Sequence, residues 1–482
     1  MIKRVVIFGG HIQALGLARQ VKARGIEVVI VTDDGCSVAR FSRSVNRTIV
    51  APIGDWTLEI EKLELPNKGT LLFPTNDEAV EMLCGRYEEF KKRFALGVPE
   101  PEVIALFNDK RKAYRFAEAQ GVHCPKCWYP DTMEDVEELS KELPYPVVVK
   151  PAVMYSFHAT FGKKAFRCDD AASLKATYER IAAKGYPLET LVVQEFLDGG
   201  AKNLYSCGVM AAVGEIVVSM QANRIRQNPM DFGNSTTYAI SCFVPQIQEQ
   251  TEALLRMVGY SGIGEVEWMW DAKSETYKFL EINTRAWKWH TISNQLGFSY
   301  IGALIDFFNE EENNENNGEN IKNNLLEDSK PKMNHPQSLD NDSQLIAPQS
   351  ASEISVLPHE AQTIISRQSD DQLLAANALP DDSEKKSDLQ SFQKMPKNIC
   401  AADNSSQKRT KKIYADEKQV AWCERLTDFT VAAKEILHGR MRLSDVIKSY
   451  RIKHESAVWS WRDPLPAIMY VLLSPILYIK RH

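Results

Sequence analysis

The sequence predicts an α/β protein with several domains, one long disordered insertion and a helical C-terminal segment. Up to residue 308, short apolar runs alternate with amphipathic helical patterns, which is typical of sheets covered by helices. The next range, residues 309–412, has almost no aromatic side chains. Of the 482 residues, 44% are hydrophobic and 25% are charged, which are ordinary values for a folded chain.

The first predicted unit is a Rossmann-like domain over residues 1–105. Its apolar runs at residues 5–8 and 28–31 are separated by a glycine pair and a helical pattern. This order of strand, glycine-rich turn, helix and strand opens a doubly wound α/β domain. Gly9, Gly10 and Gly16 do not form the G-x-G-x-x-G pattern, so NAD is not the expected ligand.

Polar side chains follow a further buried strand predicted at residues 70–73. Thr75, Asp77 and Glu78 would lie at its carboxyl end, where open α/β sheets bind ligands. Capping of the next helix explains the same residue types equally well. Both interpretations stay open for these three residues.

The central unit, residues 106–308, has two lysines that predict a bound polyphosphate. Lys110 lies in the first turn of a predicted helix, and Lys150 ends an apolar strand that Pro151 prevents from continuing. Because a lysine in such a place is costly unless an anion meets it, we expect a nucleotide triphosphate there. A second strand, residues 190–197, leads into a turn suited to face a flat base.

The sharpest signal is a hairpin predicted from residues 264–271 and 277–285. Side chains repeat every second residue, so Glu267 and Glu281 can pair across the strands while Asn283 points the same way as Glu281. Two facing carboxylates repel each other unless a cation lies between them. Oxygen ligands of this kind suit Mg²⁺ carried in with phosphates, and two ions could share the site. The alternative is a solvated hairpin with scattered charges.

Together these motifs resemble the ATP-grasp superfamily, and within it the carboxylate-amine ligases of the D-aspartate ligase type. The resemblance extends over residues 5–308 and resumes near Val420. It implies an ATP-grasp domain at residues 106–308 that follows the Rossmann-like domain. The motifs that carry it are Lys150, the run Gln194-Glu195-Phe196-Leu197, and Glu267 with the run Glu281-Ile282-Asn283-Thr284-Arg285.

The same resemblance implies roles for individual residues. The side chains and backbone that contact ATP would belong to Lys110, Lys150, Gln194, Glu195, Phe196 and Leu197. The Mg²⁺ ligands would be Glu267, Glu281 and Asn283, with two ions expected. In this family the run that corresponds to residues 194–197 forms a hinge, and an acid that binds the ribose often lies just past it. Residues 201–203 contain no acid. Glu195 or Asp198 would have to take that role.

Three arginines are the remaining catalytic candidates. Arg285 is in phase with the hairpin acids, and its planar fork suits a substrate carboxylate or the γ-phosphate. Arg224 and Arg226 lie in a run that looks like the family's basic strand beside the transferring phosphate. Either of these two could instead be a surface residue, because exposed arginines are common.

The activity implied by the resemblance is ATP- and Mg²⁺-dependent ligation of a small carboxylate to an amine through an acyl phosphate. One alternative is a bicarbonate-using carboxylase or carbamoyl-phosphate-forming enzyme, although the chain has no biotin-carrier Met-Lys-Met motif. Another is a non-enzymatic nucleotide-binding scaffold. The complete set of predicted metal ligands argues against a scaffold, because a site that no longer binds metal has no physical need for paired acids.

The remaining residues predict an insertion and a terminal helical segment. Residues 309–412 contain Phe392 as their single aromatic residue and cannot bury enough apolar area to fold, so we expect disorder. Residues 413–482 are expected to be helical, with two amphipathic helices over residues 420–450. The apolar residues 465–479 are too few to span a bilayer, which takes about 20 residues. A packed terminal helix or peripheral membrane contact would explain them.

Charge and cysteine usage limit the partners and the compartment. With 58 Lys and Arg against 64 Asp and Glu, the net charge is −6, so nucleic acid is not an expected partner. Nine scattered cysteines and no apolar leader favour the cytoplasm. The pair Cys124 and Cys127 has metal or redox spacing, but no second pair lies nearby, so we expect a turn.

Overall fold

A computed structural model describes residues 1–63, 69–153, 157, 160–230, 233, 235–312, 412–414 and 419–481. All of these residues belong to one compact unit of the chain. Most of the predicted insertion, residues 313–411, lies outside the described residues. Residues 309–312 continue a helix and residues 412–414 form a strand, so both ends of the range 309–412 have regular structure.

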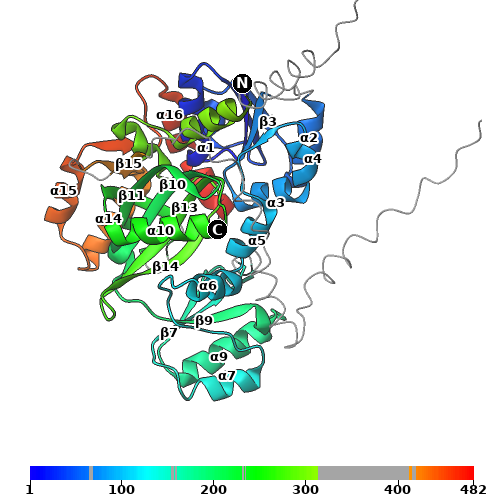
Figure 1. Cartoon of the computed structure of the whole chain (residues 1–482). Helices are drawn as coiled ribbons and strands as arrows, with labels where there is room; N and C mark the ends of the chain where they lie inside the picture. The colour runs from blue at the N-terminus through cyan, green and yellow to red at the C-terminus, as the bar shows by residue number, and fades with distance from the viewer. Residues whose placement is uncertain are drawn as a thin grey trace, which may run out of the picture. The chain divides into compact units, whose positions relative to one another are not determined.

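The N-terminal domain is a five-stranded parallel sheet with the order β3-β2-β1-β4-β5 (Figure 1). Alternate side chains of β1 enter hydrophobic clusters on opposite faces of the sheet, which explains why its strands read as continuous apolar runs. The predicted doubly wound unit is confirmed. Its strands are β1 (Arg4–Phe8), β2 (Glu27–Thr32), β3 (Arg47–Val50), β4 (Thr70–Pro74) and β5 (Ala95–Leu96).

Two helices in this region begin at a capping side chain. The Asn76 side chain accepts a hydrogen bond from the Ala79 N–H and starts α3 (Asp77–Gly85), as expected for a short polar residue after a strand. Asp109 caps α6 (Lys110–Ala119) in the same way. The other helices are α1 (Ile12–Ala23), α2 (Trp56–Lys62), α4 (Tyr87–Lys91) and α5 (Pro101–Asn108).

A four-stranded sheet with the order β6-β9-β7-β8 follows α6. Two helices, α7 (Met133–Leu139) and α9 (Ala171–Ala182), pack with it around one apolar cluster (Figure 1). Strand β7 ends at the lysine-proline pair predicted from the sequence, so Lys150 lies at the end of a buried strand. The strands are β6 (Cys127–Trp128), β7 (Val147–Pro151), β8 (Phe166–Cys168) and β9 (Leu191–Glu195).

The largest sheet has eight strands and forms the floor of the site. Its main path is β14-β13-β10-β11-β12-β16-β17, and β15 pairs with β11. Helix α10 (Pro245–Met257) contacts β10 and β11. The strands are β10 (Leu204–Ala212), β11 (Glu215–Asn228), β12 (Ser235–Cys242), β13 (Gly262–Asp271), β14 (Thr276–Asn283), β15 (Lys412–Tyr414), β16 (Ala421–Cys423) and β17 (His454–Ser456).

The C-terminal segment corrects one expectation and confirms another. Residues 421–423 are a strand rather than the start of a helix, because this buried apolar run pairs with β12. Beyond it, α14 (Arg425–Leu437) and α15 (Leu443–Arg451) are separated near Gly439 as predicted. The last helix is α16 (Leu465–Arg481). Within the described ranges, no helix is long and apolar enough to cross a bilayer.

Candidate active site

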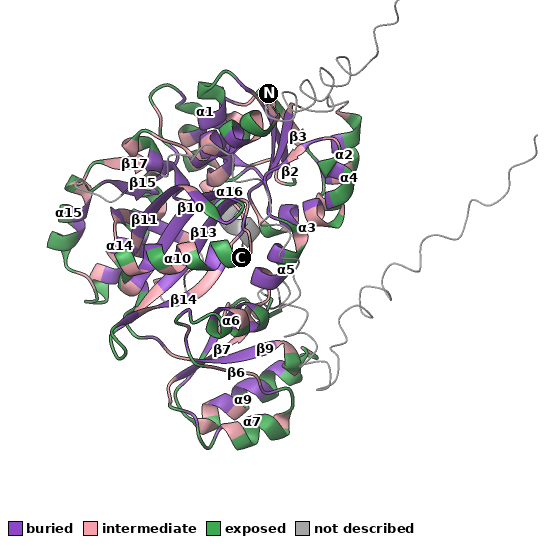
Figure 2. Ribbon diagram, in the orientation of Figure 1, coloured by how far each residue is buried: buried purple, intermediate pink, exposed green. Residues whose placement is uncertain are grey.

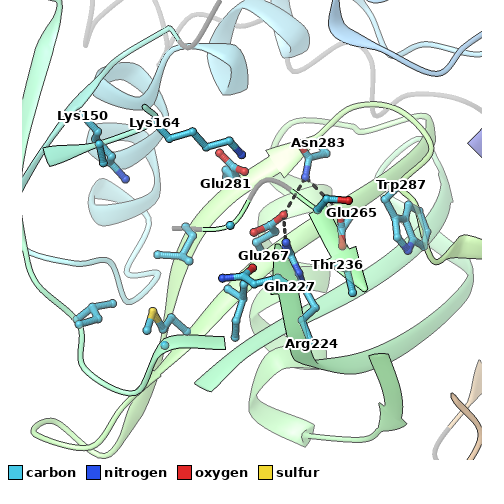
Figure 3. A pocket seen from close by; sticks show the side chains of 18 of the residues that line it. Lys150, Lys164, Arg224, Gln227, Thr236, Glu265, Glu267, Glu281, Asn283 and Trp287 are labelled. Atoms are coloured by element: carbon cyan, nitrogen blue, oxygen red, sulfur yellow. Dashed lines mark hydrogen bonds and ion pairs between the residues drawn. The ribbon is translucent and has the colours of Figure 1, made fainter. Parts of the chain in front are cut away.

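A cavity of about 660 Å³ lies between the four-stranded sheet and the large sheet. Strands β7 and β9 supply one wall, and β11, β13 and β14 supply the other. Figure 3 shows Lys150 and Lys164 on one side of Glu281, with Glu265 and Trp287 on the other. The cavity therefore has a cationic end and an end rich in acidic and aromatic groups.

The β13–β14 hairpin has the predicted register. Glu267 lies opposite Glu281, and Glu265 lies opposite Asn283. Glu267 is 9% exposed and Glu265 is 3% exposed, so the hairpin is not the solvated one that the alternative required. Glu265 lines the same cavity but was absent from the predicted ligand set, although its position two residues before Glu267 gives it the same orientation.

The hairpin acids are held by cations and by Asn283. Arg224 pairs with Glu267 at 2.5 Å, and Lys110 pairs with Glu281 at 3.0 Å. The Asn283 amide donates hydrogen bonds to Glu265 at 3.2 Å and Glu267 at 3.1 Å (Figure 3). In the part of the chain that the structure describes, no three acidic, histidine or cysteine side chains converge closely enough to hold a metal ion. Metal binding would therefore require Lys110 and Arg224 to shift toward other partners.

The pKa values of Glu265 and Glu281 depend on the same neighbouring acids and cations. Burial, and then the nearby Glu267 carboxylate, raise the pKa of Glu265 to about 7. The ion pair with Lys110 holds the pKa of Glu281 far below its ordinary value, despite burial. A divalent cation would relieve the repulsion between Glu265 and Glu267. The donor set of carboxylates and one amide oxygen fits Mg²⁺, which prefers oxygen ligands.

Three lysines converge on the cationic end of the cavity, and the sequence identified two of them. Burial, and then the charge of Lys110, lower the pKa of Lys150 to about 8. The Lys150 ammonium donates to the Tyr114 hydroxyl at 2.8 Å, which fixes its direction. Burial also lowers the pKa of Lys164, which lines the cavity. The sequence analysis did not select this lysine. Three half-buried cations that face one cavity favour an anion of high charge there.

The run of residues 194–197, which begins in β9 and is called the hinge, borders the cavity through three of its four residues. Gln194, Phe196 and Leu197 line the cavity, whereas Glu195 does not. The Glu195 carboxylate instead pairs with Lys278 and accepts a hydrogen bond from the Lys126 N–H. The proposal that Glu195 contacts the ribose is therefore corrected, and Asp198 is the acid that lines the cavity here.

Apolar side chains close the cavity beside the hinge. A flat base fits between such walls because it gains contact on both faces. The sequence did not identify these positions as part of the site, since apolar side chains do not reveal which of them border a cavity. They are Val148, Ala165, Leu204, Met269 and Leu280.

The two arginines of β11 have different environments. Arg224 lines the cavity, but Arg226 forms a buried ion pair with both carboxylate oxygens of Asp428, each at 2.8 Å. The predicted catalytic role of Arg226 is thus corrected to a structural one. Its different orientation follows from the pairing of β11 with β12, which has an extra β11 residue between Asn223 and Arg226. Such a bulge reverses the alternation of side chains.

Arg285 links the cavity to the N-terminal domain. It lines the cavity as predicted, and its guanidinium pairs with the Asp77 carboxylate at 2.6 Å and 3.3 Å. Asp77 was one of the substrate-side candidates, whereas Asn76 is the residue that caps α3. The Thr75 hydroxyl donates to the Phe8 carbonyl and is buried, so it supports the turn after β1.

Several buried polar atoms around the cavity have no hydrogen-bond partner among the described residues. Buried polar groups are normally paired, and each one left unpaired costs free energy. A bound ligand would supply the partners. The atoms are Gln194 Oε1, Arg224 Nε, Gln227 Oε1 and Trp287 Nε1.

Gly208 packs so closely against Trp287 that a larger residue should not fit there. A Cβ atom on Gly208 would lie 2.1 Å from a Trp287 ring carbon and 2.9 Å from the Tyr300 hydroxyl. We expect Gly208→Ala to lower the free energy of unfolding by about 1–3 kcal/mol through overpacking, measured by urea denaturation. Gly85→Ala is the control, because a Cβ there meets nothing within 4 Å. Equal stability of the two variants would contradict the observed packing.

Parts of this chain are similar to known proteins. The family described as "Carbamoyl-phosphate synthase L chain, ATP binding domain" matches residues 109–299. D-aspartate ligase of Enterococcus faecium is 24% identical over 303 residues, which cover 58% of this chain and 70% of the relative. Residues 109–299 are therefore similar to an ATP-binding domain. The matched residues contain both lysines, the hinge and the hairpin.

Two further known proteins are similar to this chain. The carbamoyl phosphate synthase large chain of Kocuria rhizophila is 25% identical over 206 residues, which cover 40% of this chain but 17% of that protein. The biotin carboxylase of Campylobacter jejuni has the same fold, with a TM-score of 0.51 and 20% identity over 63% of this chain and 70% of that one.

Proposed function

We propose that this ATP-grasp ligase activates a small-molecule carboxylate as an acyl phosphate and transfers the acyl group to an amine. The observation that carries this proposal is the cavity itself, in which three lysines face a hairpin of paired acids. A polyphosphate between them would neutralise the lysines and bring the metal that the acids need. The length of the match to D-aspartate ligase supports an amine acceptor.

The reaction would proceed in two steps. A carboxylate oxygen attacks the γ-phosphorus of ATP and ADP leaves, which gives the acyl phosphate. The amine then attacks the acyl carbon, phosphate leaves, and the nitrogen loses a proton to give the amide. Both steps depend more on alignment and charge stabilisation than on covalent help from the protein.

Each side chain would have a role set by its position. Lys110, Lys150 and Lys164 would bind the phosphates, while the Gln194–Leu197 hinge would hold the adenine. Arg285, oriented by Asp77, would hold the substrate carboxylate.

The metal would be held by the hairpin, and we propose two ions. Bound Mg²⁺ would neutralise the phosphate charge that develops during transfer. Arg224 would turn from Glu267 toward the transferring phosphoryl group when the metal binds. The ligands would be Glu267, Glu281 and Asn283, joined by Glu265.

Hydroxylamine trapping tests the activation step. Candidate carboxylic acids are supplied with MgATP and hydroxylamine, and a hydroxamate is expected from the acid that is activated. An acyl phosphate reacts with hydroxylamine whether or not the natural amine is known, so the test does not need the second substrate. ATP-dependent amide formation without any trapped hydroxamate would contradict the acyl-phosphate step.

A bicarbonate-using reaction is the second candidate, and the carbamoyl-phosphate synthase family match favours it. It predicts ATP hydrolysis that bicarbonate stimulates in the absence of an amine. The ligase predicts no such stimulation. The non-enzymatic scaffold predicts neither hydroxamate nor hydrolysis.

ATP affinity is expected to weaken above pH 8. The Lys150 pKa of about 8 means that this lysine loses its proton as the pH rises through that value, whereas bound phosphate requires the proton. The Kd for ATP should therefore rise above pH 8, approaching about tenfold per pH unit, as measured by calorimetry. Lys150→Arg keeps its charge and should flatten this dependence. The same pH profile in both proteins would exclude Lys150 as a phosphate ligand.

The partners and the location stay predictions. Small-molecule substrates agree with the size of the cavity. For residues 465–479, a packed helix and peripheral membrane contact were the two predictions, and the packing of Ala467 and Tyr470 against the core supports the packed helix. Detergent-free fractionation of cells tests the membrane contact together with the cytoplasmic location.

A further inference from the structure

Helix α14 turns several large apolar side chains outward. It packs on β11 and β12 of the large sheet, where its inner face buries Asp428, Val431, Ala432 and Glu435. Its outer face exposes Leu426, Phe429 and Leu437, which are 42%, 70% and 86% exposed. Both carboxylates of the helix that point inward are paired, with Arg226 and Arg440.

The outward residues form a stripe. Leu426, Phe429, Ala433 and Leu437 are spaced by three, four and four residues, which places them on one side of a helix. A surface helix normally turns such a stripe toward the core. Single exposed apolar residues are ordinary, whereas a continuous stripe marks a surface that contacts another molecule.

Basic side chains border this stripe. Arg425 and Lys434 are exposed on α14 itself, on either side of the apolar residues. Residues 425–453 contain seven Lys and Arg against three Asp and Glu, whereas the whole chain has a net charge of −6. Two of those three acids, Asp428 and Glu435, are buried in ion pairs. The outside of this segment is therefore strongly cationic.

Helix α15, which begins shortly after α14 ends, adds exposed residues of the same kinds. It exposes Leu443 and Ile447, which are 59% and 46% exposed, together with Lys448. Arg442 precedes it and is also exposed. Figure 2 shows α14 beside strand β11 and α15 farther out, at the left edge of the view. We call the exposed apolar residues 426, 429, 437, 443 and 447, with the cations 425, 434, 442 and 448, the basic apolar face.

We propose that the basic apolar face docks on the surface of an anionic phospholipid bilayer. Phe429 and Leu437 would enter the boundary between headgroups and acyl chains while the cations meet the lipid phosphates. A second copy of this chain fits less well, because the cationic borders of two copies would repel each other. The proposal goes beyond the ligase activity, since no residue of this face lines the cavity.

Cosedimentation of the full-length protein with lipid vesicles tests the proposal. We expect the protein to pellet with vesicles of mixed phosphatidylglycerol and phosphatidylcholine, to stay in solution with phosphatidylcholine alone, and to be released by high salt. The triple substitution Leu426→Ser, Phe429→Ser and Leu437→Ser should lower vesicle binding by about tenfold or more. ATP hydrolysis should be unchanged, because the cavity is untouched.

Helix α16 supplies a matched control. Its residues Ile468, Val471 and Leu472 are 49%, 56% and 63% exposed, but none of their described neighbours on the helix is basic. The triple substitution of these three residues by Ser should leave vesicle binding intact. If the α14 variant fails to fold, as judged by circular dichroism, Arg442→Glu with Lys448→Glu replaces it and should also abolish binding.

Four outcomes would overturn the proposal. These are equal binding of the wild-type protein to anionic and neutral vesicles, full binding by the folded α14 variant, loss of binding only in the α16 variant, and self-association that the α14 substitutions abolish. The last result would assign the stripe to a second copy of the chain. None of these outcomes changes the result expected from the hydroxamate assay. The membrane-binding proposal and the ligase proposal can therefore fail independently.

Discussion

Glu281→Gln is expected to lower ATP-dependent turnover by about a thousandfold or more while the protein stays folded. Glu281 faces Glu267 across the hairpin and pairs with Lys110, so it connects the proposed metal to the phosphate-binding lysines. The amide of glutamine keeps the shape of the side chain but removes the charge that the metal needs. Steady-state release of phosphate measures the effect.

The control for Glu281→Gln is Glu275→Gln in the turn of the same hairpin. Glu275 is exposed and does not line the cavity. Turnover of this variant should equal that of the wild-type protein. Thermal unfolding of both variants separates lost chemistry from lost structure, and near-normal turnover of folded Glu281→Gln would remove this residue from the metal site.

Asp428→Ala is expected to lower the free energy of unfolding by about 3–5 kcal/mol. The substitution leaves the Arg226 guanidinium, which is 1% exposed, without its charge partner. It also removes the acceptor of hydrogen bonds from the Thr237 and Tyr450 hydroxyls. The Asp428–Arg226 pair joins α14 to strand β11 of the large sheet. Urea denaturation should therefore show the lower free energy of unfolding clearly.

The double substitution Arg226→Met with Asp428→Leu completes this experiment. Replacing both members of a buried ion pair by apolar residues restores much of the stability that one substitution removes. Because Arg226 does not line the cavity, the double variant should keep its turnover. Loss of turnover in a stable double variant would return Arg226 to the catalytic residues. Glu215→Ala, which breaks an exposed pair with Arg256, should cost less than about 1 kcal/mol.

Local patterns in the sequence predicted the parts of the site that lie on regular strands. The period of two along a strand was enough to place Glu267, Glu281 and Asn283 on one side of the hairpin. The proline after Lys150 fixed the end of β7 in the same way. These predictions held because they depend on neighbours within one strand or one tight hairpin.

The predictions that failed depend on contacts between distant segments. The bulge before Arg226 follows from pairing with β12, and its acidic partner comes from a helix about 200 residues away in the sequence. Glu195 is drawn from the cavity by Lys278 of another sheet. Lys164 lies outside any recognisable strand, although its position after a loop rich in polar residues was a signal that could have been weighed.

We propose above all that the paired acids share a divalent cation with a nucleotide held by the lysines. Electron paramagnetic resonance of Mn²⁺, used in place of Mg²⁺, measures this directly in the presence of a non-hydrolysable ATP analogue. The wild-type protein should immobilise Mn²⁺ only when the nucleotide is present, and Glu281→Gln should lose that signal while still binding the nucleotide. Equal Mn²⁺ binding by both proteins, or none by either, would contradict the account.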